Sequence, residues 1–260
     1  MIALEFGQAQ QIITLLFAGL CIGSFLNVVI YRLPRGKSIV HPSSRCGCCK
    51  SPLPFYRNIP VWSFIATGGR CSKCGVFYSP RYLGVEILTP LLFLLAWWVL
   101  GWGPQSFFIM GFIATLLAGS FIDLDLRIIP DSLTLGAWAV ALLFIGVAGD
   151  QLAIGFVDAL LGSAAGFLSF YILSRGYALM MGDEGLGGGD VKLMGFIGAV
   201  VGWQGVVTTT FLASILGLIV GLTLIFGMGK SRKYPLPFGP FLAVGAIAHA
   251  LGFSVLEYFF

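Results

Sequence analysis

Two short acidic stretches carry the residue types in this chain that are best suited to chemistry. Residues 121–131 include Asp123, and residues 185–194 include Asp190. Each stretch lies at the edge of a strongly apolar run. Ionisable groups at membrane depth are costly, and they tend to face the protein interior. We therefore expect Asp123 and Asp190 to meet across a bundle of helices.

Two carboxylates that share one site cannot easily both ionise, so one of them keeps a proton. The ionised carboxylate then activates a water molecule as general base, and the protonated one donates to the scissile carbonyl oxygen. This is aspartic-protease chemistry, and neither Asp123 nor Asp190 receives a fixed role, because such a pair titrates as a unit. Asp125 is the runner-up for Asp123; the two cannot both face one interior, since residues two apart point in nearly opposite directions on a helix.

Three glycines, Gly187, Gly188 and Gly189, stand directly before Asp190. Adjacent glycines can adopt positive φ and let another segment approach closely. A protease holds its substrate extended, often through backbone hydrogen bonds, so we expect these glycines to bind substrate. The alternative is that Asp190 merely caps the free N–H groups of a helix N-terminus.

The composition is that of a membrane protein. The 260 residues are 58% hydrophobic and only 10% charged, and the mean hydropathy is +0.95, whereas soluble domains are about 25% charged. The apolar runs are continuous rather than alternating, which favours helices over a barrel. Soluble, disordered and collagen-like proteins are excluded. The sequence predicts an all-α polytopic membrane protein with about eight transmembrane helices, near residues 12–30, 84–99, 106–122, 133–147, 153–173, 191–203, 206–228 and 238–259.

The basic residues predict the orientation. Nine of the 15 Lys and Arg residues lie between Arg32 and Arg81, a stretch without Asp or Glu. Basic loops stay in the cytoplasm. With eight spans, all basic residues and both acidic stretches then lie on the cytoplasmic side, and both termini are periplasmic. This distribution argues against a nucleic-acid partner and is consistent with binding to membrane lipid.

The cysteines of the basic loop predict a metal site. Cys46 and Cys49 form one CxxC pair and Cys71 and Cys74 a second, which is close to zinc-ribbon spacing. Four thiolates satisfy tetrahedral zinc, and such sites fold small domains that lack a core. Cys48 is an extra thiol that could compete as a ligand. The chain thus divides into a first transmembrane helix (1–31), a cytoplasmic cysteine-rich loop (32–82) and a transmembrane domain (83–260).

These motifs together resemble a known family. Asp123 lies six residues before the Ile129-Pro130-Asp131 step, and Gly-x-Gly-Asp with Val-Lys-Leu-Met follows at residues 187–194. This combination resembles the type IV prepilin peptidases, which are GxGD aspartic proteases. The N-terminal region also resembles the family, through Ser44-Arg-Cys46, Cys49, Asn58-Ile-Pro60, Cys71, Cys74, Arg81-Tyr82 and Val85-Glu86, and so does Pro237-Phe-Gly-Pro240 near the last span.

The resemblance implies an enzyme of the bacterial inner membrane with Asp123 and Asp190 as its catalytic pair. It would remove the basic leader peptide from type IV prepilins or type II secretion pseudopilins at the cytoplasmic face. Members with the cysteine loop also N-methylate the new N-terminal residue with S-adenosylmethionine, although no glycine fingerprint for this donor is present. Glu86 is a candidate for holding the substrate's N-terminal amine, and it could equally be the buried partner of a nearby arginine.

Two other functions compete with this one. A proton-coupled membrane transporter could use the Asp123 and Asp190 pair as proton carriers beside a glycine-rich helix break; the internal repeats that often accompany transport are not found. A structural assembly protein could use the zinc loop to recruit a cytoplasmic partner. Cleavage of a prepilin by the purified protein would distinguish the peptidase from both.

Overall fold

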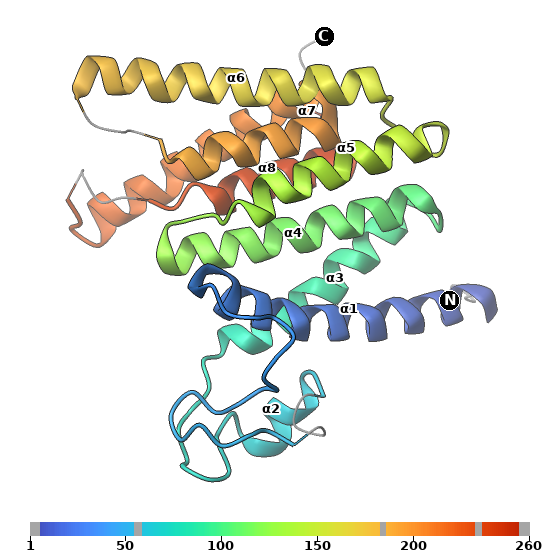
Figure 1. Ribbon diagram of the computed structural model, residues 1–260, viewed down its shortest axis with the longest axis vertical. Helices are drawn as coiled ribbons and strands as arrows, with labels where there is room; N and C mark the ends of the chain where they lie inside the picture. Colours follow the sequence, from blue (N-terminus) through green and yellow to red (C-terminus); the bar gives the residue numbers. More distant parts are fainter. Residues whose placement is uncertain (1–5, 55–58, 183–185, 232–235, 255–260) are drawn as a thin grey trace. The chain divides into compact units, whose positions relative to one another are not determined.

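The computed structural model describes residues 6–54, 59–182, 186–231 and 236–254 (Figure 1). Asn58 and Gly185, which belong to the motifs above, lie outside these ranges, as do three of the basic residues counted for the orientation, Arg57, Arg232 and Lys233. The chain forms two compact units, Met1–Gly101 and Trp102–Phe260. Each unit is described by itself.

The first unit is built on two crossing helices. It contains α1 (Phe6–Arg32), a 3₁₀ turn η1 (Leu33–Arg35), the short α2 (Trp62–Thr67) and α3 (Arg81–Leu100). A Cβ atom at Gly19 would lie 2.5 Å from Pro90 Cα, and one at Gly23 would lie 2.9 Å from Glu86 Cα. Two glycines one turn apart on α1 therefore allow the two backbones to touch, as small residues do between membrane helices. Figure 1 shows α1 and α3 crossing.

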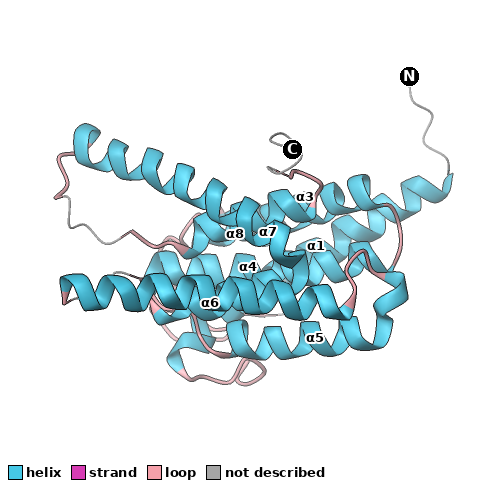
Figure 2. Cartoon of the chain, turned by 90° about the horizontal axis from the view of Figure 1, so that it is seen from above, coloured by secondary structure: helices cyan, strands magenta, loops and turns pink. Residues whose placement is uncertain are grey.

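The second unit is a helical bundle. Its elements are α4 (Pro104–Leu126), the π-helical turn η3 (Ser132–Gly136), α5 (Ala137–Ala148), the 3₁₀ turn η4 (Gly149–Gln151), α6 (Phe156–Met181), α7 (Gly188–Leu222), the π-helical turn η5 (Thr223–Gly227) and α8 (Gly239–Ala250). No strand occurs in the described ranges (Figure 2), which contain only two isolated β-bridges in the cysteine loop. The predicted all-α fold class is confirmed.

Helix α7 reverses direction at Gly202. This residue has φ 70° and ψ 179°, which is outside the helical region. A Cβ at Gly166 of α6 would touch the carbonyl oxygen of Met194 and lie 3.3 Å from Cγ2 of Val206. In an unbroken helix residues 12 apart are separated by roughly 18 Å, so both could not reach Gly166. The two arms of α7 therefore fold back on each other near the turn expected from the sequence.

The apolar helices make the chain a multi-pass membrane protein. Six helical segments in the described ranges are long and apolar enough to cross a bilayer. One of them, Gly188–Gly227, has 40 residues, which is roughly 60 Å of helix and twice the hydrocarbon core. It also contains the reversal at Gly202, and α8 is a further apolar helix of 12 residues. The total of eight spans stays a prediction.

Two helix boundaries differ from those expected. Helix α6 continues through Met181 instead of ending near Leu173, because Ala178, Leu179 and Met180 are strong helix formers. Gly182, with φ 74°, ends it in the left-handed conformation. Helix α7 begins at Gly188, one turn before the expected start at Val191.

Contact between α6 and the first arm of α7 depends on facing glycines. A Cβ at Gly162 would overlap the carbonyl oxygen of Gly198, and a Cβ at Gly198 would overlap that of Gly162. The backbones therefore meet without intervening side chains, as in small-residue interfaces of membrane helices.

Replacing Gly162 by alanine should destabilise the bundle by about 1–3 kcal/mol, because the methyl group would force two helix backbones apart. Thermal unfolding of the purified protein in detergent measures the effect. Gly176→Ala on the same helix is the matched control: nothing lies within 4 Å of its Cβ position, so the better helix former should stabilise slightly. Equal melting temperatures for the two variants would contradict this account.

Candidate active site

Asp123 lies in the last turn of α4 and is only 6% exposed. Its Oδ2 accepts a hydrogen bond from the backbone N–H of Gly239, at 2.9 Å. Asp125, two residues further on, is exposed. The helix therefore turns Asp123 toward the interior of the bundle and Asp125 away from it, in agreement with the helical spacing.

The partner of Asp123 is the N-terminus of another helix. Gly239 is the first residue of α8 and is followed by Pro240, which has no N–H to donate. The carboxylate satisfies one of the free N–H groups at this helix end and meets the positive end of its dipole. Sequence reasoning missed this contact, although Gly-Pro at the start of an apolar run is a signal for a helix N-terminus.

The segment after α4 packs between the two acidic stretches. Arg127 ends the helix in the left-handed conformation, with φ 56° and ψ 37°, and turns the chain back toward the bundle. Ile129 is 8% exposed. Its Cδ1 would lie 3.2 Å from a Cβ at Gly239, and its own Cβ 3.3 Å from a Cβ at Gly189. Ile129 therefore lies between the segments that hold Asp123 and Asp190.

Asp190 lies in the first turn of α7 and is partly buried. The N-cap of α7 is Gly187, which has no side chain to cap this end, and the alternative that Asp190 serves the helix N-terminus stays a prediction. Oδ1 of Asp190 is buried and finds no hydrogen-bond partner in the part of the chain described. The carboxyl groups of Asp190 and Asp123 interact electrostatically. The structure thus brings together two acidic side chains that are 67 positions apart in the sequence.

The three glycines before Asp190 behave differently from expectation in one respect. None of Gly187, Gly188 and Gly189 has a positive φ, because the last two already belong to helix α7. The positive φ that glycine permits is therefore not used at these three positions. Close approach by another segment does occur, at Gly189, where Ile129 leaves no room for a larger side chain.

An ion pair joins the two acidic stretches nearer the surface. Nζ of Lys192 lies 2.6 Å from Oδ1 of Asp131, and both side chains are partly exposed. Exposed pairs of this kind stabilise by about 0–1 kcal/mol. Sequence reasoning did not foresee the pair, because residues 61 positions apart carry no local signal of contact.

In the first unit, Cys46, Cys49, Cys71 and Cys74 form a compact cluster. Their sulfur atoms all lie within 4.8 Å of one another, with 3.7 Å between Cys46 and Cys74 and 3.9 Å between Cys49 and Cys71. Tetrahedral zinc with bonds of about 2.3 Å requires sulfurs about 3.8 Å apart. All four cysteines are free thiols, and Cys48 is exposed outside the cluster. The predicted cysteine set is therefore assembled, with spacing that fits a divalent metal.

Backbone N–H groups of the loop donate hydrogen bonds to the cysteine sulfurs and favour their thiolate form. Backbone N–H groups of Cys74 and Lys73 donate to the sulfur of Cys71 and lower the pKa of this thiol to about 6. At Cys74 the N–H of Val76 favours the thiolate, but burial and hydrogen bonds with Cys71 and Cys49 raise the pKa to about 12. Four crowded sulfurs cannot all carry charge unless a cation compensates them, which suits a metal centre.

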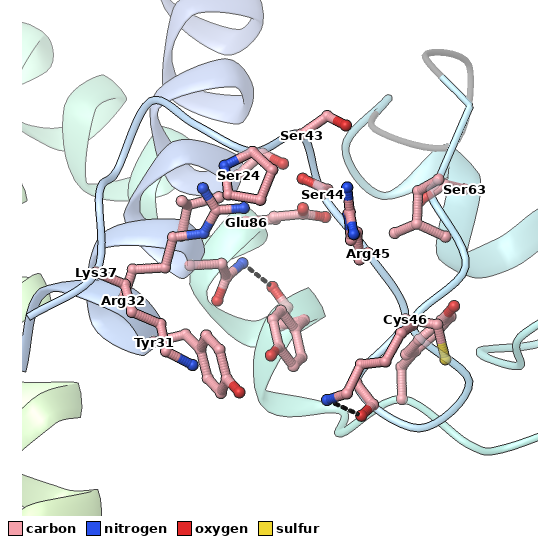
Figure 3. A pocket seen from close by; sticks show the side chains of 18 of the residues that line it. Ser24, Tyr31, Arg32, Lys37, Ser43, Ser44, Arg45, Cys46, Ser63 and Glu86 are labelled. Atoms are coloured by element: carbon pink, nitrogen blue, oxygen red, sulfur yellow. Dashed lines mark hydrogen bonds between the residues drawn. The ribbon is translucent and has the colours of Figure 1, made fainter. Parts of the chain in front are cut away.

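Glu86 belongs to the first unit, whereas Asp123 and Asp190 belong to the second. It is partly buried near the start of α3, and its Oε2 accepts a hydrogen bond from the N–H of Val61, at 2.8 Å. Figure 3 shows Glu86 between the side chains of Arg32 and Arg45, in a pocket of the cysteine loop. Both readings of Glu86 from the sequence, an amine ligand and an arginine partner, are compatible with this position.

The bundle and its buried carboxylates define a multi-pass membrane protein with an acidic pair in its second unit. Residues 110–222 match the type IV leader peptidase family, and residues 17–100 match the bacterial peptidase A24 N-terminal domain. The chain belongs to the type IV leader peptidase family and is an enzyme. Neither match supports the transporter hypothesis.

Curated relatives from several bacteria cover most of the chain. The chain is 36% identical to the prepilin leader peptidase/N-methyltransferase of Aeromonas salmonicida (strain A449), over 92% of this chain and 90% of the relative. The chain is also 36% identical to the protein of that name from Legionella pneumophila, over 92% of this chain and 91% of the relative. The protein of that name from Myxococcus xanthus (strain DK1622) is 38% identical, over 82% of this chain and 63% of the relative. No solved structure matches the chain.

Replacing Asp190 by asparagine should stabilise the protein, by about 1 kcal/mol, because a neutral amide removes the mutual repulsion that makes a pair of neighbouring acids costly. Thermal unfolding in detergent at neutral pH measures the shift. Asp150→Asn, at an exposed acid in η4, is the control and should leave the melting temperature unchanged. A lower melting temperature for Asp190→Asn would mean that this carboxylate stabilises the fold.

Proposed function

We propose that this protein removes the basic leader peptide from type IV prepilins or type II secretion pseudopilins and then N-methylates the new N-terminal residue. The observation that carries the peptidase half is the acidic pair. One oxygen of Asp123 is fixed by the N–H of Gly239, and Oδ1 of Asp190 is buried without a partner among the described residues. An unpaired buried carboxylate is costly to a purely structural site.

Asp123 and Asp190 are the proposed catalytic residues. In the half-protonated pair, the ionised carboxylate takes a proton from water, and the protonated one donates to the scissile carbonyl oxygen. The pair as a unit performs both steps. Gly187, Gly188 and Gly189 are proposed to bind the extended substrate beside Asp190, since residues without side chains leave the backbone accessible.

The methyltransferase half is proposed for the first unit. S-adenosylmethionine supplies an activated methyl group: the amine lone pair forms the N–C bond, the S–C bond leaves its electrons on sulfur, and the amine loses a proton. Glu86 is proposed to hold the substrate's N-terminal amine. Zinc is the proposed occupant of the four-cysteine cluster, where it would support the loop.

The proposed topology follows from charge. The first helix (1–31), the cysteine loop (32–82) and the peptidase domain (83–260) would be arranged with the loop and both acidic stretches on the cytoplasmic side of the inner membrane. Both termini would be periplasmic, in accordance with the positive-inside rule. The enzyme would contact membrane lipid and its prepilin substrates, and no nucleic acid is expected as a partner.

Purified protein in detergent should shorten a prepilin by its leader, and Asp123→Asn or Asp190→Asn should lower the cleavage rate at least 10³-fold, because each removes one half of the acid–base pair. Gel electrophoresis follows leader loss, and mass spectrometry of the product with methyl donor present detects the added methyl group. Asp125→Asn on the exposed side of α4 is the control. Cleavage that survives either substitution would refute the pair.

Metal analysis should find one zinc per chain, and Cys46→Ser or Cys71→Ser should release it, because a tetrahedral site does not tolerate the loss of a thiolate. These two cysteines are buried, so their loss should also destabilise the loop, which limited proteolysis reports. Cys48→Ser is the matched control and should retain the metal. Zinc-free wild-type protein with an intact loop would defeat this proposal.

A further inference from the structure

A cavity of about 580 Å³ lies in the first unit, beside the cysteine loop. It is lined by the second half of α1, the loop, α2 and the start of α3, and all its lining residues fall between Ser24 and Glu86. Its volume lies within the range of small-molecule sites, about 300–1,000 Å³. Neither Asp123 nor Asp190 is among the lining residues, so the purpose of this cavity needs a separate explanation.

The cavity is lined by charged side chains of both signs, and the basic ones outnumber the acidic one. Arg32, Lys37, Arg45 and Lys50 line it, and Glu86 is its one acidic residue. The N–H of Val61 holds the Glu86 carboxylate in place, and the two arginines flank it in Figure 3. Such a site fits a ligand that carries an anionic group and, at a separate point, a cationic group.

A buried polar atom in the wall also lacks a partner. Asn27 is 5% exposed, and its Nδ2 donates to the carbonyl oxygen of Tyr82, at 3.0 Å. Its Oδ1 is buried and accepts no hydrogen bond from any described residue. An orphaned acceptor is costly, and a ligand N–H or O–H group would satisfy it. The rings of Tyr31, Phe64 and Tyr82 add apolar faces to the wall.

We propose that this cavity is the binding site for the methyl donor, a sulfonium amino acid joined to a nucleoside. The proposal rests on the proposed N-methyltransferase function. The basic side chains would bind the donor's carboxylate. Glu86, which is proposed to hold the substrate's amine, would also attract the donor's sulfonium group, from which that amine takes the methyl. The aromatic rings would contact the adenine ring, as aromatic faces do for nucleic-acid bases, and Oδ1 of Asn27 would accept from an amine or hydroxyl group.

The phosphate of an anionic lipid is the main competing ligand. It would use the basic residues equally well, but it offers no cation to Glu86. A carboxylate beside a bound phosphate would be repulsive. The mixed charges therefore favour a ligand that carries both anionic and cationic groups over a purely anionic one.

The cavity also adjoins the cysteine cluster. Cys46 belongs to the cluster and also lines the cavity. Tyr78 of the same loop lines the cavity as well. The metal-binding loop thus forms one wall of the donor site. This arrangement explains why a methyl-transfer site would need a metal that takes no part in the chemistry.

Isothermal titration calorimetry of the full-length protein in detergent, with S-adenosylmethionine and with S-adenosylhomocysteine, tests the proposal. Ser63→Trp on α2 fills the cavity and should raise the Kd of both ligands at least about tenfold. Ala66→Trp is the matched control: it lies on the same helix, is exposed and does not line the cavity. It should leave both Kd values unchanged.

Glu86→Gln provides the second arm, because glutamine keeps an acceptor for the Val61 N–H and removes only the charge. It should weaken S-adenosylmethionine about tenfold more than S-adenosylhomocysteine, which lacks the sulfonium charge. If Ser63→Trp does not fold, as judged by thermal unfolding and metal content, the difference between the two losses of affinity in Glu86→Gln tests the proposed site by itself. Equal losses for the two ligands would overturn the role of Glu86.

Three outcomes would overturn the proposed site. Wild-type protein that methylates its product and binds donor with a Kd unaffected by Ser63→Trp would refute the cavity alone. Protein that neither binds nor transfers would refute the methyltransferase function as well. If phosphatidylglycerol vesicles displace bound donor from wild type and bind less to Ser63→Trp, while Glu86→Gln strengthens that lipid binding, the cavity is a lipid phosphate site.

Discussion

Burying two carboxyl groups in an apolar bundle is the constraint on which the second unit of this protein depends. Asp123 is accommodated because the N-terminus of α8 offers it a backbone N–H and a favourable dipole. Asp190 lies in the first turn of α7, but its Oδ1 finds no hydrogen-bond donor among the described residues. The carboxylate of Asp123 is therefore held by a hydrogen bond, whereas Oδ1 of Asp190 is left without one. The difference between two chemically identical side chains arises from the helix ends that surround them.

Glycine is the means by which the bundle brings these groups together. Gly162 and Gly198 let α6 touch α7, Gly202 reverses α7, and Gly189 admits Ile129 beside the acidic pair. In a membrane the hydrophobic effect does little to drive helices together, so close backbone packing must supply much of the association. The same residues that stabilise the bundle thereby determine where the carboxylates lie.

Much of this arrangement could be predicted from the sequence. The apolar runs predicted a helical membrane protein, and the spacing of Cys46, Cys49, Cys71 and Cys74 predicted the cluster. Both signals can be read because they lie within short stretches of the sequence. The proximity of Asp123 and Asp190 was expected only from their chemistry and a resemblance. The contact with Gly239 and the pair of Asp131 with Lys192 were missed, since the sequence carries no periodic signal for contacts between distant segments. The helical start at Gly188 was also misjudged, because helix propensity alone disfavours glycine there.

The hydrogen bond to Asp123 comes from the main chain at Gly239, and this has a consequence for how such a site is read and altered. A main-chain amide is the same whichever residue bears it, so this part of the acidic pair's environment is invisible to any search for reactive side chains. What residue 239 does control is space: a Cβ there would lie 2.9 Å from the carboxylate oxygen. Even the methyl group of an alanine at residue 239 would thus crowd the carboxylate of Asp123. What the site requires at this position is an absence of atoms rather than a functional group.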